Sequence, residues 1–151
     1  MPNTIAASVM STKVHIGTTK AIAAVPADFA SDVFKEIKGL VEVGELGGTY
    51  ETGQVDRIDT GVREKYKSVK ELGELELSFV YLSGDAGQAA AEAAYAANAP
   101  YNFKLVLSTG DTFYFRALVM STRIATGTAS DTVRMIVTLA RTDMDPVKVA
   151  A

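Results

Sequence analysis

Few side chains in this sequence could support nucleophilic catalysis. His15 is the single histidine and cysteine is absent, so one imidazole is available as a general base and no thiol as a nucleophile. A serine nucleophile needs a base and usually a third group that orients it, and the sequence contains no G-x-S-x-G motif. His15 also lies near the chain start, in a stretch rich in Thr and Lys. We therefore expect no catalytic triad.

Paired carboxylates could support acid and base chemistry, and the sequence has several. Glu74 and Glu76 lie on one face of a predicted strand, and other carboxylates occur at Glu51, Asp56 and Glu71. A glycosidase would also need a cleft with aromatic platforms for sugar, but the chain contains no Trp. We interpret these carboxylates as solvated charge and predict that the chain is not an enzyme.

Metal and phosphate sites are not predicted either. Asp56, Arg57 and Asp59 lack the spacing of a calcium-binding loop, and no H-E-x-x-H motif is present. The glycine-rich stretch from Gly44 to Gly61 matches neither the dinucleotide-binding pattern nor the P-loop pattern. The sequence thus predicts no catalytic residue, no metal and no cofactor.

Composition and charge limit the remaining possibilities. A chain of 151 residues with a hydrophobic fraction of 48% has the size and composition of one globular domain, residues 1–151. The net charge of -3 gives no positive surface for holding a phosphate backbone. The N-terminus lacks the pattern of a signal peptide, and no stretch approaches the length of a membrane span. We expect a soluble protein made in a cytoplasm, without a membrane partner.

A long polar segment at 44–63 is the main candidate for an interaction element. It mixes glycines with charges and has no apolar periodicity, so it cannot bury itself in a core. Long loops usually serve a partner or a site. We predict a long loop that contacts another subunit through Glu45, Tyr50, Glu51, Asp56, Arg57, Asp59 and Arg63.

The elements around this segment follow from periodicity. Alternating apolar residues predict strands at 12–16, 33–43, 64–69, 74–82, 101–108, 113–119 and 133–139. An alanine-rich helix is predicted at 85–98, with Asp85 and Gln88 at capping-box spacing. Residues 1–11 and 143–151 are predicted to be a loose arm and a polar tail. The fold class is therefore mainly β, a sandwich or barrel with one flanking helix.

Several segments stand in a characteristic order between Val33 and Thr142. They are a strand ending in V-G-E-L-G-G, a charged glycine-bearing loop, the strand G-E-L-E-L-S-F-V-Y, a helix opening after S-G-D, and the hairpin F-K-L-V-L-S-T-G-D-T-F-Y-F-R-A-L-V. This order resembles the tail tube proteins, or major tail proteins, of siphophages. Each piece is weak by itself, and the specificity lies in the combination.

The resemblance implies a fold and an assembly. Such proteins form a β-sandwich flanked by a helix and assemble into stacked hexameric rings, whose inner sheets join into one barrel around a channel for DNA. The chain would then be a virion structural protein of a phage tail, assembled in the host bacterial cytoplasm. Its partners would be copies of itself, the tape measure protein, the tail terminator and the distal tail protein. DNA would pass through the lumen during ejection without specific binding.

The resemblance also suggests roles for particular residues. Glu74 and Glu76 are expected to face the lumen or another solvated side, and an ordinary outer surface is the alternative. Carboxylates on a channel wall would keep DNA from adhering, because like charges repel. The loop at 44–63 would reach an adjacent subunit or ring, while the N-terminal arm and C-terminal tail would tie rings together.

Two other functions remain open at this stage. The first is the tube protein of a contractile tail-like machine. The second is a β-sandwich module that binds carbohydrate or protein on a surface. A sugar-binding module usually exposes aromatic side chains, whereas most aromatics here alternate onto the predicted inward faces. These aromatics are Phe79, Tyr81, Tyr101, Phe103, Phe113 and Phe115.

Overall fold

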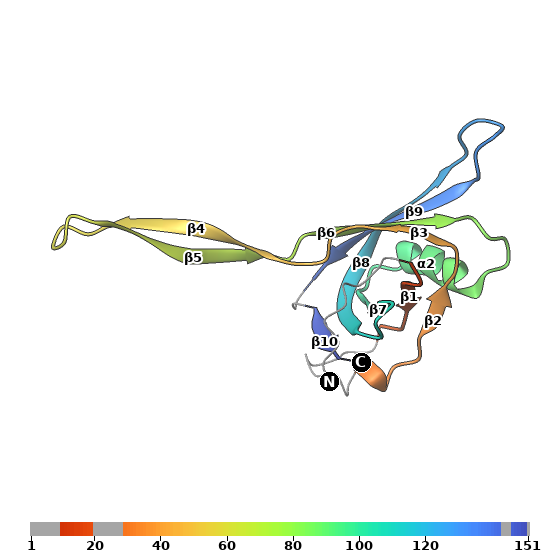
Figure 1. Cartoon of the computed structure of the whole chain (residues 1–151), viewed down its shortest axis with the longest axis horizontal. Helices are drawn as coiled ribbons and strands as arrows, with labels where there is room; N and C mark the ends of the chain where they lie inside the picture. Colours follow the sequence, from red (N-terminus) through yellow and green to blue (C-terminus); the bar gives the residue numbers. More distant parts are fainter. Residues whose placement is uncertain (1–9, 20–28, 143–145, 151) are drawn as a thin grey trace.

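The computed structural model describes residues 10–19, 29–142 and 146–150. Its strands are β1 (Lys13–Ile16), β2 (Lys35–Ile37), β3 (Leu40–Val43), β4 (Thr49–Asp56), β5 (Arg63–Glu71), β6 (Glu74–Val80), β7 (Tyr101–Val106), β8 (Thr112–Ala125), β9 (Arg134–Arg141) and β10 (Val147–Val149), and the helix α2 spans Ala86–Ala96. Figure 1 shows a β body from which the β4–β5 hairpin projects. The N-terminal arm predicted at 1–11 lies outside the described residues, apart from Met10 and Ser11.

The body is one antiparallel sheet that folds over on itself at β8. The strand order is β2-β1-β7-β8-β9-β6-β3, with β10 beside β8. The first half of β8 pairs with β7 and β10. From Ala117 to Ala125 it pairs with β9, with a register shift between Val119 and Ser121. A shift of this kind is a β-bulge, which bends a strand and increases its twist. Two layers result, which we name the β7 layer (β2, β1, β7 and the first half of β8) and the β3 layer (the second half of β8, β9, β6 and β3).

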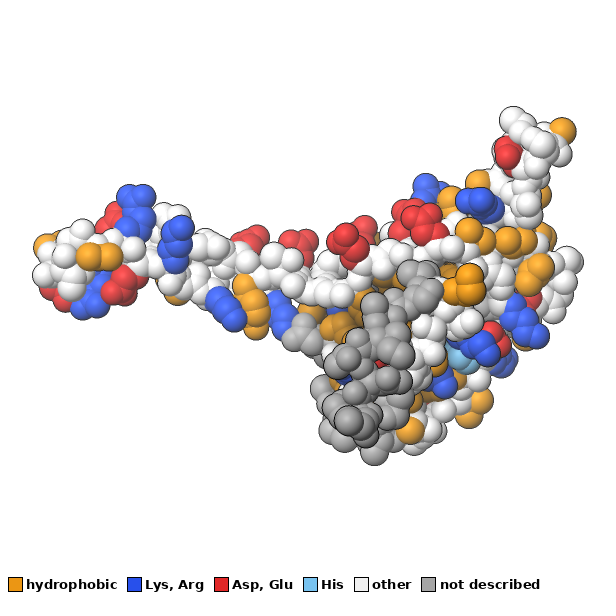
Figure 2. Space-filling model, viewed as in Figure 1, with side chains coloured by type: hydrophobic (Ala, Val, Ile, Leu, Met, Phe, Trp, Pro, Cys, Tyr) orange, Lys and Arg blue, Asp and Glu red, His pale blue; other side chains and the backbone are white. Residues whose placement is uncertain are grey.

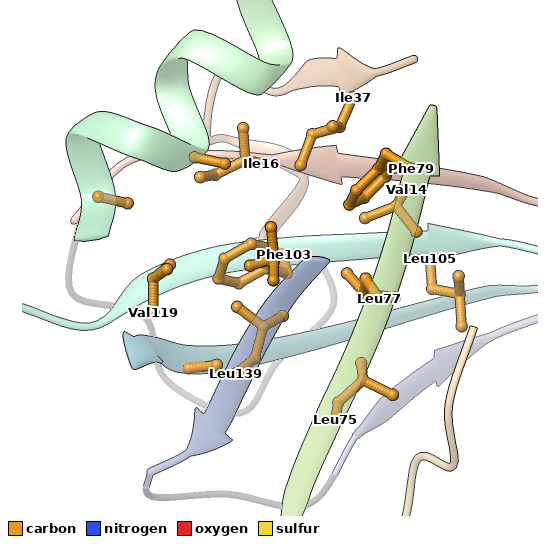
Figure 3. Packing of buried hydrophobic residues seen from close by; sticks show 14 of the residues in the cluster. Val14, Ile16, Ile37, Leu75, Leu77, Phe79, Phe103, Leu105, Val119 and Leu139 are labelled. Carbon is orange, nitrogen blue, oxygen red and sulfur yellow. The ribbon is translucent and has the colours of Figure 1, made fainter. Parts of the chain in front are cut away.

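The core lies between these two layers. Alternation on β6 buries Leu75, Leu77 and Phe79 and exposes Glu74 and Glu76, as the sequence pattern predicts. Figure 3 shows β6 crossing β1 and β7, with its apolar side chains directed at the side chains of the opposite layer. The predicted mainly β sandwich is confirmed. Tyr81, predicted to continue the inward face, instead lies beyond the strand end and is exposed.

The helix closes the sandwich beside β2 and is anchored by one buried amide. Asp85 is the N-cap, and its carboxylate accepts a hydrogen bond from the Gln88 backbone N at 3.1 Å. The return bond of a capping box is replaced: the Gln88 side chain donates to the carbonyls of Lys38 and Val80, at 2.9 and 2.8 Å, and accepts from the Leu82 N at 3.1 Å. Gln88 therefore ties the helix to the β2–β3 bend and to the end of β6.

Strands occupy much of the segment that the sequence analysis predicts to be a loop. Thr49–Asp56 and Arg63–Glu71 form the antiparallel β4–β5 hairpin, which pairs with no strand of the body among the described residues. Periodicity missed β4 because both of its faces are exposed, so its side chains do not alternate between apolar and polar. At about 3.3 Å per residue, the hairpin strands extend for roughly 25 to 30 Å.

Part of the predicted C-terminal tail is also a strand. Val147–Val149 pairs as β10 with β8, in the register Val147 to Tyr114 and Val149 to Thr112. This edge of β8 is available because β9 pairs only with the later part of that strand. The hydrogen bonds of a sheet edge thus order a segment of only three residues.

A carboxylate joins the ends of β1 and β7. Asp32 accepts hydrogen bonds from the Thr18 N at 2.9 Å, the Thr18 hydroxyl at 2.6 Å, the Val33 N at 2.8 Å and the Asn102 side-chain amide at 2.8 Å. Burial favours the neutral acid, but these hydrogen bonds to Asn102, Thr18 and Val33 outweigh it and lower the pKa of Asp32. The charged form of Asp32 therefore stabilises the folded state.

Replacing Gln88 by Ala is expected to lower the free energy of unfolding by about 2 to 4 kcal/mol, because two carbonyls and one N–H would lose their buried partner. Chemical denaturation of the purified subunit measures the loss. Glu92→Ala, an exposed position on the same helix, is the matched control and should change stability by less than about 0.5 kcal/mol. Equal effects of the two substitutions would contradict the anchoring role.

Asp32→Asn is expected to destabilise the subunit at pH 7, with a deficit that shrinks in acid. Because the folded pKa is lowered, the stabilisation is present above the unfolded pKa of about 4 and is lost as the pH falls through the folded pKa. Urea denaturation of both proteins between pH 7 and pH 3 measures the difference. A difference that stays constant over this range would show that the charge of Asp32 does not matter.

Candidate functional site: assembly surfaces

The β3 layer has two backbone edges without a strand partner among the described residues. At one side, β3 pairs with β6 alone. At the other side, β8 from Leu118 to Ala125 pairs with β9 alone, because β7 reaches β8 only as far as Ala117. Exposed edges of this kind are templates for pairing with another chain.

The outer edge of the β7 layer is covered in contrast. The start of α2 lies so close to β2 that a side chain at Gly87 would collide with the Glu36 carbonyl and the Ile37 backbone. The Asp85 carboxylate also accepts from the Lys38 N at 3.2 Å. Glycine at position 87 and aspartate at 85 thus let the helix cap this edge. Among the described residues, the two edges of the β3 layer stay open, as does the outer edge of the three-residue strand β10.

The outer face of the β3 layer carries the two carboxylates singled out in the sequence. Register places Glu74 opposite Ala140 and Glu76 opposite Thr138, and both side chains are exposed. Glu42 of β3 lies opposite Ser78 on the same face. Arg123 approaches Glu76 with Nη2 to Oε2 at 3.6 Å, but both side chains remain more than half exposed. This exposed ion pair contributes little to stability.

The base of the hairpin is held to the body by a buried arginine. The Arg141 guanidinium donates to the Leu72 carbonyl, and the Arg141 N donates to the Gly73 carbonyl at 3.2 Å. Gly73 has a positive φ of 77°, a conformation that favours glycine, and it lets the chain turn from β5 into β6. The Gly44 N donates to the Glu76 carbonyl at 2.9 Å on the other strand. These contacts fix the hairpin base relative to the β3 layer.

The structure separates the predicted loop residues into groups. Asp56, Arg57, Asp59 and Arg63 meet at the hairpin tip, where Arg63 pairs with Asp56 at 2.7 Å and Arg57 pairs with Asp59 and with Glu64. Tyr50 and Glu51 lie near the base, on opposite faces of β4. Glu45 is exposed before β4 begins. The residues predicted as one loop surface therefore occupy several surfaces.

Sequence reasoning named Tyr50, Arg57 and Arg63 but missed the other apolar side chains and the lysines of the hairpin. Ile58 at the tip is fully exposed. The other large exposed apolar residues along the hairpin are Tyr50, Val55, Val62, Tyr66 and Val69. An isolated two-stranded hairpin is at best marginally stable in water. The sequence pattern that could have predicted the hairpin strands is the β-branched and aromatic residues at intervals through 50–69. The many charged residues between them interrupt this pattern. The hairpin therefore has the features of a segment that needs a partner.

The residues considered for chemistry do not gather into a site. His15 lies on β1 opposite Glu36 and Lys104, and burial, followed by the charge of Lys104, lowers the pKa of its imidazole. Within the described ranges, no group of three His, Cys, Asp or Glu side chains is placed to hold a metal ion. Among those same residues, no helix is long and apolar enough to cross a membrane.

Solved structures share this fold. No family model matches the sequence, and no curated protein matches it. The SPP1 tail tube superposes with a TM-score of 0.62 at 17% identity, over 95% of this chain and 80% of that one. The tail of an empty GTA particle, refined with C6 symmetry, gives 0.65 at 14% identity over 97% and 99% of the two chains. The PVC sheath-tube complex of an extracellular contractile injection system gives 0.66 at 14% identity over 98% and 94%. At these identities the similarity shows that the chain has the tail tube fold.

Proposed function

We propose that this chain is the structural subunit of a phage tail tube and that it works by assembling with copies of itself into stacked hexameric rings around a channel for DNA. The observation that carries the proposal is the pair of open edges on the β3 layer. The fold shared with tail tubes, including one refined with C6 symmetry, supports it. The assembled protein would be a component of the virion.

The strand directions of the β3 layer suit ring closure. Its neighbours β8, β9, β6 and β3 are all antiparallel, so the two outer strands run in opposite directions. If β3 of one copy pairs with β8 of the next, the new pair is again antiparallel and the alternation continues without a break. A head-to-tail contact of this type closes into a ring when the rotation permits. Ring closure would also remove both open edges.

The outer face of the β3 layer would then line the channel, because the other face of this layer packs against the β7 layer in the core. This position places Glu42, Glu74 and Glu76 on the wall. Arg123 and Arg134 lie on the same face, so among the described residues carboxylates outnumber cations there by three to two. DNA carries a dense negative charge, so an excess of carboxylates on the wall disfavours its adhesion. Passage without specific binding follows from this arrangement.

The hairpin would reach an adjacent subunit or ring, since its exposed apolar residues need a partner and its strands extend by roughly 25 to 30 Å. The N-terminal arm and the C-terminal segment would tie rings together. In a complete tail the end rings would meet a tail terminator and a distal tail protein, and the lumen would hold a tape measure protein. The fold is similar to tubes of contractile injection systems to the same degree, so the proposal covers the tube subunit of either kind of tail.

Val41→Pro is expected to reduce tube formation by at least about tenfold, because proline removes a backbone donor from an edge strand. The register shift between Leu40 and Glu42 leaves Val41 without a partner residue in β6, so the pairing of β3 with β6 should survive the substitution. Negative-stain microscopy and sedimentation of the concentrated protein measure assembly, and thermal melting checks the subunit. Val41→Thr keeps the N–H and is the control. Tubes formed equally by both variants would sink the edge-pairing model.

Glu74→Lys combined with Glu76→Lys is expected to yield tubes that retain double-stranded DNA, whereas wild-type tubes do not. Co-sedimentation with short DNA fragments measures retention, and about 0.5 M salt should release the DNA because the attraction is electrostatic. Loss of assembly in this variant would place the two carboxylates at a contact between subunits. Tubes that form and retain no DNA would place them on the outer surface.

A further inference from the structure

The strand register sorts the charges of the hairpin onto two faces. One side of the ribbon carries three cross-strand pairs, Asp56 with Arg63, Gln54 with Lys65, and Thr52 with Lys67. The register shift beyond Thr52 brings Tyr50 and Lys70 onto that side as well. We name this side the basic face: it has four cations against one carboxylate. The opposite side, the acidic face, carries Glu51, Glu64 and Glu71 with Tyr66 and has no cation from either strand.

Side-chain contacts support this assignment. The Nζ atoms of Lys67 and Lys70 lie 4.9 and 5.2 Å from the centre of the Tyr50 ring, so these three side chains share one face. On the other face the Tyr66 ring lies against Gly53, where a Cβ atom would collide with it. The two tyrosines therefore stabilise opposite sides of the same ribbon.

The charged side chains at the hairpin tip are paired with one another, so the unpaired charges of the hairpin lie nearer its base. Arg63 is paired with Asp56, and Glu64 with Arg57. Lys65 and Lys67 on the basic face form no ion pair within the described part of the chain. The same holds for Glu51 and Glu71 on the acidic face. The unpaired charge is therefore positive on the basic face and negative on the acidic face.

The acidic face is continuous with the acidic surface of the body. Figure 2 shows a row of acidic side chains along one long side of the molecule, from the hairpin onto the body, while basic and hydrophobic side chains lie on the opposite side of the hairpin base. On the outer face of the β3 layer the exposed carboxylates are Glu42, Glu74 and Glu76, beside Arg123 and Arg134. A surface with an excess of carboxylates thus extends from the β3 layer along the hairpin.

We infer that the hairpin works with its two faces in different roles: the acidic face extends the channel wall, and the basic face with Tyr50 docks on the body of a second copy of this chain. The inference rests on the proposed tube function and adds Glu51 and Glu71 to the channel residues. It also assigns Tyr50, Lys65 and Lys67 to the contact between subunits.

Charge complementarity identifies a second copy as the partner of the basic face. The hairpin from Thr49 to Glu71 contains five basic and five acidic residues, so the net charge of -3 belongs entirely to the rest of the chain. The rest of another copy therefore carries an excess of three carboxylates over cations, which complements the lysines. Tyr50 supplies an apolar and aromatic contact at the base end of this face, of the type that interfaces favour.

Matched charge reversals in assembly and DNA-retention assays test the two roles. One variant combines Lys65→Glu with Lys67→Glu, and the other combines Glu51→Lys with Glu71→Lys. Each reverses two exposed side chains of the same hairpin, and melting curves check that the body remains folded. The full chain is concentrated until wild type forms tubes, and pelleted protein and co-sedimented short double-stranded DNA are then measured.

The lysine reversals are expected to reduce pelleted tubes by about tenfold or more, with partial recovery in Lys65→Gln combined with Lys67→Gln, because removal of the cations is milder than reversal. The glutamate reversals are expected to leave tubes intact and to make them retain DNA. Equal effects of both reversals on assembly would overturn the assignment of faces. The assignment would also be overturned if wild-type tubes retained DNA through the lysines. It would be overturned as well if tubes of the variant with Glu51 and Glu71 reversed retained no DNA. Absence of wild-type tubes would instead contradict the proposed function.

Discussion

The bend of β8 is the feature on which the whole arrangement depends. A single strand of this length belongs to both layers, and the bulge between Val119 and Ser121 marks where it passes from one to the other. Because β9 pairs with β8 only from Ala117 onward, the earlier part of that edge is free to accept β10. Because β7 ends before the bend, the opposite edge of the later half stays open. One local irregularity thus determines which edges are closed within the chain and which are left for a neighbour.

Polar side chains hold the surrounding elements at this scaffold. The buried Gln88 joins α2 to the β2–β3 bend and to β6, and the half-buried Asp32 joins the ends of β1 and β7. The buried Arg141 holds the hairpin base to β9. Each of these side chains satisfies backbone or amide groups at the ends of strands. The hairpin is therefore joined to the body at its base, while its two strands pair with no strand of the body within the described ranges.

The distribution of exposed aromatics separates a tube subunit from a carbohydrate-binding module. Tyr50 and Tyr66 lie on opposite faces of a thin ribbon, and the exposed Tyr81 and Tyr95 lie on the body. Sugar platforms instead gather aromatic rings on one surface. The exposed apolar and charged groups on this chain are concentrated on a projecting hairpin beside open sheet edges. Such surfaces are typical of a protein whose partners are copies of itself.

The sequence by itself determined the elements whose faces meet different environments. Leu75, Leu77 and Phe79 alternate with carboxylates on β6, and the Asp85 cap precedes an alanine-rich helix, so the period of the side chains reveals both elements. Position on a common strand face also identified Glu74 and Glu76 as a pair.

Only the tertiary structure decided what depends on pairing between distant segments. β4 has no buried face and therefore carries no periodic signal. β10 is only three residues long, too short for its Val-Lys-Val alternation to identify a strand, and it is ordered by the edge of β8. The two charged faces of the hairpin exist only through its register, which a one-residue shift in β5 changes. The Gln88 side chain reaches the carbonyls of Lys38 and Val80 because the fold brings them to the helix start. These features arise from long-range hydrogen bonds, which no local pattern encodes.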